Sequence, residues 1–198
     1  MPAKIRLASE SDAAQILDIY APVVRETAIS FEWEPPSVDQ IRDRMRRVLE
    51  MLPWLVCDVD GRIAGYAYAS PFKTRAGYRW SCELTVYVHP EFHRCGVGRA
   101  LYAALLPCLT AQGYQVAVAV ITIPNPASVG LHESIGMRRV GTYHAIGHKF
   151  GQWLDDGVWQ MELGPRRESP EPPVPFHDLV GTQVWQKALD KGTRLLRV

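Results

Sequence analysis

The chain has 198 residues, of which 47% are hydrophobic and 22% are charged, and its formal net charge is +1. Because domains hold roughly 150 residues, this length predicts one domain with an appendage. The composition is that of a globular protein and excludes a wholly disordered chain. The nearly balanced charge argues against nucleic acids and anionic membranes as partners, since both attract a larger basic excess.

The cysteines and the N-terminal segment indicate the cellular compartment of the protein. The 4 cysteines have no CxxC spacing, so we expect free thiols, no disulfide framework and no metal site. Residues 1–6 lack the apolar stretch of a signal peptide. The apolar run 116–121 falls far short of the ~18 residues of a membrane span. These features predict a soluble cytoplasmic protein.

The first third of the chain alternates between strand and helix patterns. Residues 4–8 predict a strand, and the capping pattern from Ser9 to Asp12 opens a helix whose apolar residues recur at helical spacing. A second helix is expected after Ser37. The strand-like runs 54–59 and 62–69 flank Asp60-Gly61, a dipeptide typical of two-residue hairpins.

The remaining elements complete a mixed architecture. They are a strand at 80–88, a helix at 98–112 ended by Gly113, a strand at 115–122, a short helix at 126–135, and strands at 137–147 and 157–163. The order β-α-α-β-β-β-α-β-α-β-β predicts an α/β fold of the α+β type. Its central sheet is expected to be twisted, mixed and mostly antiparallel, with flanking helices.

The composition changes after residue 164. Residues 165–175 contain five prolines, at positions 165, 170, 172, 173 and 175, which is typical of a linker. Residues 176–198 carry enough apolar residues for a helix that packs onto the rest. The sequence therefore predicts a domain at 1–164, a linker at 165–175 and a helical extension at 176–198.

One turn has the features of a phosphate-binding site. Arg94-Cys95-Gly96-Val97-Gly98-Arg99 follows a strand and opens a helix. Glycines let backbone N–H groups approach an anion, the helix N-terminus favours negative charge, and arginines add ion pairs. A tight turn with solvated arginines is the alternative. The segment lacks the GK[ST] of a P-loop and the complete GxGxxG of a dinucleotide fold.

Two blocks in a set order give a resemblance. The strand 83–88 with His89-Pro90 and Arg94-x-Gly96-x-Gly98, followed by Asn125-x-x-Ser128 and the segment to Gly136-Met137, resembles the GNAT superfamily of acyl-CoA-dependent N-acyltransferases. The segments 87–90, 111–114, 123–125 and 147–149 resemble its phosphinothricin acetyltransferase subfamily.

The resemblance implies a GNAT fold, acetyl-CoA as co-substrate, no metal, and a homodimer. It also implies acetylation of the α-amino group of phosphinothricin, methionine sulfoximine or methionine sulfone, an activity linked to antibiotic and herbicide resistance.

The resemblance also assigns roles to residues. An amine must lose a proton before it attacks a thioester, and Glu83 is the expected general base. His132 replaces the superfamily's usual tyrosine and is expected to serve the leaving thiolate or the reaction intermediate. A surface glutamate and a structural histidine are the alternatives. His93 stands where Gln or Arg is usual. The expected acetyl-CoA-binding residues are Val86, Tyr87, Val88, Arg94, Cys95, Gly96, Val97, Gly98, Arg99, Asn125 and Ser128.

The acceptor would carry a carboxylate and a second polar group. Lys73 and Arg75 are expected to bind these groups, with Phe31, Tyr78, Trp80 and Val158 as pocket walls. Val158 would come from a neighbouring strand or a second subunit. Two alternatives stay open: an acceptor such as a polyamine, an aminoglycoside or a protein N-terminus, and a CoA-binding module without catalysis.

Overall fold

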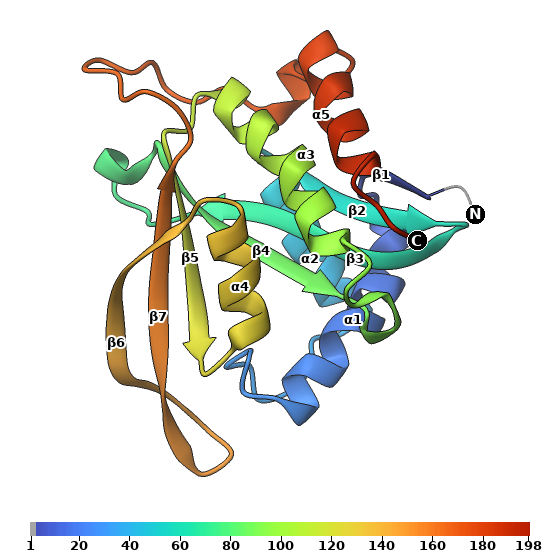
Figure 1. Ribbon diagram of the computed structural model, residues 1–198, viewed down its shortest axis with the longest axis vertical. Coiled ribbons are helices and arrows are strands. Elements are labelled where there is room, and N and C mark those ends of the chain that lie inside the picture. Colours follow the sequence, from blue (N-terminus) through green and yellow to red (C-terminus); the bar gives the residue numbers. More distant parts are fainter. Residues whose placement is uncertain (1–2) are drawn as a thin grey trace.

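The computed structural model describes residues 3–198, and Figure 1 shows them as one sheet flanked by helices. Met1 and Pro2, part of the segment inspected for a signal peptide, lie outside the described residues. The 7 strands follow the spatial order β1-β2-β3-β4-β5-β7-β6. The main elements are β1 (Ala3–Leu7), α1 (Ala13–Glu26), α2 (Val38–Leu49), β2 (Trp54–Val59), β3 (Arg62–Pro71), β4 (Ser81–Val88), α3 (Val97–Gln112), β5 (Val116–Ile123), α4 (Pro126–Ser134), β6 (Arg138–Lys149), β7 (Gln152–Glu162) and α5 (Gln183–Thr193).

The predicted fold class is confirmed. The order of strands and helices from β1 to β7 matches the predicted order, and among the strands of residues 3–198 only β4 and β5 pair in parallel. Asp60 and Gly61 form the turn between β2 and β3 with left-handed φ values of 53° and 83°. Such values suit the two-residue turn that the Asp-Gly pair predicts.

The strands of the β6–β7 hairpin are longer than the expected strands at 137–147 and 157–163, so those boundaries were wrong. The strands run to Lys149 and from Gln152, joined by a turn at Phe150 and Gly151 with φ values of 51° and 75°. A left-handed phenylalanine is rare, so Phe150-Gly151 is not one of the Asn-Gly or Asp-Gly pairs that predict such a turn. The ammonium of Lys149 donates to the carbonyls of Val24 (2.7 Å) and Ser30 (2.6 Å), which ties the hairpin to the end of α1.

Two apolar layers hold the sheet. On one face, α3 buries Leu101 and Leu105 in a cluster with Leu55 and Cys82 of the sheet. On the other face, α1 and α2 pack against β2 and β3 around the buried Met45. Strands β5, β7 and β6 extend beyond α1 and α2 in Figure 1. That part of the second face is more open to solvent.

The C-terminal region packs on the domain. Helix α5 lies along α3 and near β1, and it buries Trp185 and Ala188. Phe176, just after the proline-rich segment, is also buried. Gly192 of α5 faces α3 so closely that an added Cβ would lie 2.6 Å from the carbonyl oxygen of Ala100. Among the described residues, no helix has the length and apolar character needed to cross a membrane.

We expect Gly192→Ala to lower the free energy of unfolding by roughly 1–3 kcal/mol, because its Cβ would press on the α3 backbone. Gly130→Ala on α4 is the matched control, since a Cβ there meets nothing within 4 Å. The control should be neutral or gain up to about 1 kcal/mol of helix propensity. Urea unfolding followed by circular dichroism measures both. An equal increase in the free energy of unfolding for both variants would contradict the close packing of α5 on α3.

Candidate active site

The site is built where two neighbouring strands separate. Strands β4 and β5 pair only at Ser81–Val116, Cys82–Ala117 and Glu83–Val118. Beyond Glu83, β4 keeps its partner β3 on one side, and β5 keeps β7. Figure 1 shows the two arrows diverging with α4 beside the opening. The backbone of β4 past Glu83 therefore has N–H and C=O groups that no strand on this side satisfies.

A cavity of about 160 Å³ lies in this opening. It collects six of the residues expected from the sequence, which come from β4, from α4 and from the loop between β5 and α4. Its walls are Ile29, Glu83, Leu84, Thr85, Val86, Tyr87, Val120, Ile121, Thr122, Asn125, Ser128 and His132.

Glu83 is the carboxylate of this cavity. Its strand neighbours Cys82 and Leu84 are buried in the α3 layer, so alternation directs Glu83 to the other face of the sheet. Burial raises the pKa of Glu83, and the negative charge of Asp156 raises it further. A carboxylate with a raised pKa is a stronger base near neutral pH than an ordinary one.

Asp156 is a residue that the sequence analysis missed. It lies on β7 opposite Thr122 of β5, and the Thr122 hydroxyl donates to its carboxylate at 2.9 Å. Burial raises the pKa of Asp156 as well. The sequence pointed to this carboxylate only through an Asp155-Asp156 pair within a strand-like segment. Its proximity to Glu83 depends on the register across three strands.

His132 is buried, with 3% of its surface exposed. Its Nδ1 lies 2.8 Å from the Ser128 carbonyl, and its Nε2 lies 2.9 Å from the hydroxyl of Tyr102. Since a carbonyl only accepts, Nδ1 carries the hydrogen and Nε2 accepts from Tyr102. Burial lowers the pKa of His132, so its ring is neutral near pH 7. The sequence analysis missed Tyr102, because its place on an apolar helix is typical of a core residue.

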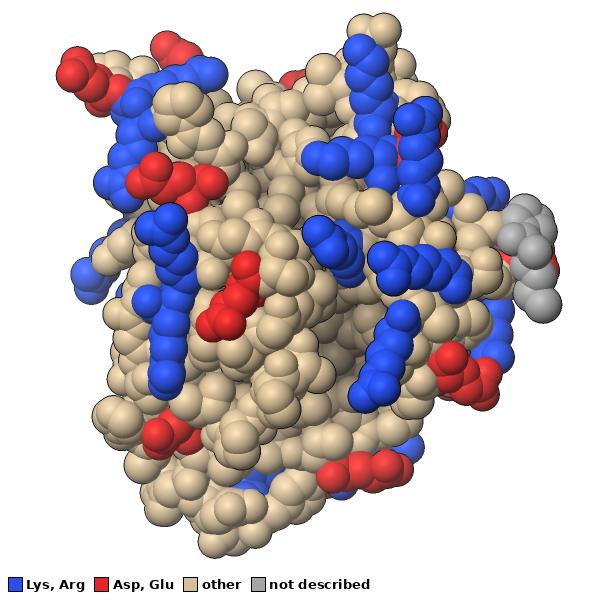
Figure 2. Space-filling model, in the orientation of Figure 1, with Lys and Arg blue, Asp and Glu red and all other residues tan. Residues whose placement is uncertain are grey.

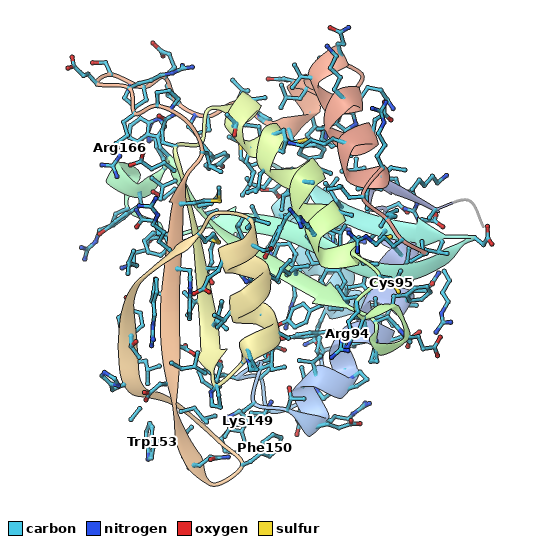
Figure 3. All side chains as sticks on the ribbon, viewed as in Figure 1. Arg94, Cys95, Lys149, Phe150, Trp153 and Arg166 are labelled. Carbon is cyan, nitrogen blue, oxygen red and sulfur yellow. The ribbon has the colours of Figure 1, made fainter. Side chains whose placement is uncertain are left out.

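The β4–α3 loop presents a row of backbone donors. Gly96, at φ 80°, precedes α3, and no side chain caps the helix. Ala100 N–H donates to the Gly96 carbonyl at 2.9 Å, whereas no acceptor within residues 3–198 takes the N–H groups of Val97, Gly98 or Arg99. Uncapped donors at a helix N-terminus attract an anion. Figure 3 places the side chains of Arg94 and Cys95 at this loop.

His93 is engaged by the protein itself. Its Nε2 donates to the carbonyl of Val88 at 3.1 Å, at the end of β4. This bond ties the start of the loop to the strand that lines the cavity.

The residues expected to bind the acceptor lie outside the cavity of one chain. Lys73, Arg75 and Tyr78 are on the exposed loop between β3 and β4, where the Lys73 ammonium lies 5.4 Å from the ring of Tyr78. The indole N–H of Trp80 donates to the Glu171 carbonyl at 2.8 Å, so the proline-rich segment engages that side chain.

The other two acceptor residues are nearer the site. Phe31 packs against Gly147 of β6, beside the base of the hairpin. Val158 pairs with the cavity residue Val120 across β5 and β7, so it lies one strand away from the cavity wall.

Comparison with known proteins gives the family. The acetyltransferase (GNAT) domain family matches residues 5–158. This chain belongs to the GNAT acetyltransferase family. The match includes every strand from β2 to β6 and the diverging pair that forms the cavity.

Relatives of this GNAT acetyltransferase include proteins named for small amino acid substrates. It is 41% identical to the phosphinothricin N-acetyltransferase of Streptomyces viridochromogenes over 88% of this chain and 93% of that one. It is 36% identical to the L-methionine sulfoximine/L-methionine sulfone acetyltransferase of Pseudomonas paraeruginosa over 86% of this chain and 100% of that one.

A solved structure shows the same fold. The phosphinothricin acetyltransferase of Sinorhizobium meliloti, in complex with AcCoA, superposes with a TM-score of 0.81 at 33% identity. The match covers 89% of this chain and 99% of that one.

Proposed function

We propose that this GNAT acetyltransferase transfers an acetyl group from acetyl-CoA to the α-amino group of phosphinothricin, methionine sulfoximine or methionine sulfone. The observation that carries the proposal is the cavity between β4 and β5, which sets Glu83 beside the unpaired backbone of β4. The names of the relatives support the choice of substrates.

The β4–α3 loop has the properties that the CoA pyrophosphate requires. The free N–H groups from Val97 to Arg99 would hold its oxygens, and Arg94 and Arg99 would add charge. An added Cβ at Gly98 would lie 2.9 Å from Leu131, so only glycine leaves this backbone bare.

The cavity fits the other end of acetyl-CoA, which supplies the thioester. The pantetheine arm would lie along the unpaired backbone of Val86, Tyr87 and Val88, with Asn125 and Ser128 on the opposite wall. The backbone of Cys95 and Gly96 would complete the phosphate end of the site.

Glu83 would begin the reaction by taking a proton from the acceptor's ammonium group. The freed amine nitrogen then bonds to the thioester carbon, and N–H groups of β4 stabilise the negative oxygen. The C–S bond breaks, and the sulfur takes the nitrogen's second proton. His132 is neutral, so its Nε2 could relay that proton to the sulfur. For this, Nε2 would first have to lose its hydrogen bond from the Tyr102 hydroxyl.

Lys73 and Arg75 would bind the acid groups of the acceptor. Ser70 pairs with Glu83, so the loop that bears both cations leaves the sheet shortly beyond the base. A guanidinium binds a carboxylate or a phosphinate through two hydrogen bonds. Phe31, Tyr78, Trp80 and Val158 would enclose the amino acid, with Trp80 first leaving the Glu171 carbonyl.

A second copy of the chain would complete this site. The open face of the sheet and the hairpin tip carry large apolar side chains, including Tyr143 at 52% exposure and Trp153 at 67%. Figure 3 shows Trp153 and Phe150 projecting at the hairpin. Burial of these groups favours a homodimer. The free cysteines suit a reducing cytoplasm.

Glu83→Gln is expected to lower kcat by roughly 10²–10⁴-fold, because the amide cannot take the ammonium proton. A thiol-release assay with acetyl-CoA measures turnover on phosphinothricin, methionine sulfoximine, methionine sulfone, spermidine, an aminoglycoside and a short peptide. Wild-type activity should be confined to the first three acceptors.

Glu50→Gln, an exposed change at the end of α2, is the matched control and should retain activity. Full turnover by Glu83→Gln would refute the role of the base. Preference for a cationic amine would refute the acceptor class, and CoA binding without turnover on any acceptor would favour a non-catalytic module.

Asp156→Asn should shift the acidic limb of the kcat/KM profile to lower pH. The charge of Asp156 raises the pKa of Glu83, so removing that charge lets Glu83 stay deprotonated in more acidic solution. Asp190→Asn on the exposed side of α5 controls for net charge. A limb that does not move, or that moves to higher pH, would show that Asp156 does not act on the base.

Tyr143→Glu should convert the dimer into monomers, because it places a charge in the open sheet face. Sedimentation velocity at micromolar concentration measures the mass. Val184→Glu, at an equally exposed apolar position on α5, should leave the dimer intact. A monomeric wild type, or a dimer that tolerates Tyr143→Glu, would rule out this interface.

A further inference from the structure

The C-terminal segment lies against the β4–α3 loop. Arg197 N–H donates to the carbonyl of Cys95 at 3.0 Å. An added Cβ at Gly96 would meet the Leu195 carbonyl oxygen at 2.9 Å. Figure 1 shows the C-terminus beside the loop that precedes α3. Residues about a hundred positions apart thus form one surface.

Helix α5 fixes this segment in place. Gly192 sits against the backbone of α3, and the Thr193 hydroxyl accepts from Ile5 N–H of β1 at 2.9 Å. Trp185 buries all but 5% of its surface near the start of the same helix. The backbone of residues 195–197 is therefore held at both the helix and the loop, and this lowers the entropy cost of any contact that its side chains make.

The side chain of Arg197 starts beside the row of backbone donors. Its Cγ lies 4.0 Å from the position of a Cβ on Gly96, the residue that precedes α3. Within residues 3–198, Arg94, Arg99 and Arg197 form no ion pair, whereas Arg6, Arg44 and Arg46 do. Figure 2 shows basic side chains spaced around a hollow on this face.

We propose that Arg197 is a phosphate ligand for acetyl-CoA, so that the C-terminal extension completes the co-substrate site. The backbone donors of α3 and the guanidinium of Arg197 would then hold phosphate oxygens from two sides. Arg197 lies outside residues 5–158, the part that matches the GNAT domain family. The inference rests on the proposed acetyl-CoA site and is independent of the acceptor amine.

Isothermal titration of CoA into the full chain tests the proposal without catalysis. Arg197→Gln should weaken CoA binding about tenfold, the effect of losing one charge-assisted hydrogen bond. Glutamine keeps the backbone N–H that bonds to Cys95, and an unchanged melting temperature would show that the segment stays docked. Arg166→Gln is the control, since Arg166 lies at the far end of the molecule in Figure 3.

A second titration with 3′-dephospho-CoA distinguishes the phosphates. If Arg197→Gln loses affinity for both ligands, Arg197 binds the pyrophosphate. If it loses affinity for CoA alone, Arg197 binds the 3′-phosphate. Either result supports the proposal. Equal affinities for Arg197→Gln and Arg166→Gln would overturn it. Arg94→Gln separates the phosphate site of the β4–α3 loop from the role of Arg197. If Arg94→Gln weakens CoA binding and Arg197→Gln does not, the loop binds phosphate without Arg197. A wild type that binds no CoA would instead refute the proposed function.

Discussion

The separation of β4 from β5 after three residue pairs is the constraint on which the site depends. A strand inside a sheet normally satisfies its backbone on both sides, so a strand that loses one partner needs other groups there. In this protein each strand keeps its outer neighbour, β3 or β7, and the sheet stays continuous. Both edges of the opening are therefore held in the sheet, and α4 closes one side of it with His132.

The two faces of the sheet carry different chemical groups around this opening. On the α3 face, the helix that packs the core also begins with uncapped donors, so the element that stabilises the domain also offers an anion site. On the opposite face, Glu83 and Asp156 share a half-buried region. The negative charge of Asp156 raises the pKa of Glu83, which favours proton uptake by Glu83. The Glu83–Asp156 pair and the uncapped end of α3 therefore lie on different sides of one sheet.

The periodicity of the chain predicted most of the fold, because each strand and helix shows its pattern over a few neighbouring residues. Asp60-Gly61 predicted a turn for the same local reason. The turn at Phe150 was missed because its left-handed φ is imposed by the hairpin and by the anchor at Lys149. Tyr102 was missed because a core position and a partner of His132 look alike in a sequence.

The sequence by itself determined the family, the α/β architecture and the candidates Glu83 and His132, since motifs and periodicity are read along the chain. Only the tertiary structure decided which residues meet in the cavity, that Asp156 lies near Glu83, and that Arg197 lies at the β4–α3 loop. It also showed that Lys73 and Arg75 stand outside the cavity of one chain. These relations depend on strand register and on the packing of α5 against α3. Both are set by contacts between residues far apart in the chain, which no local pattern encodes.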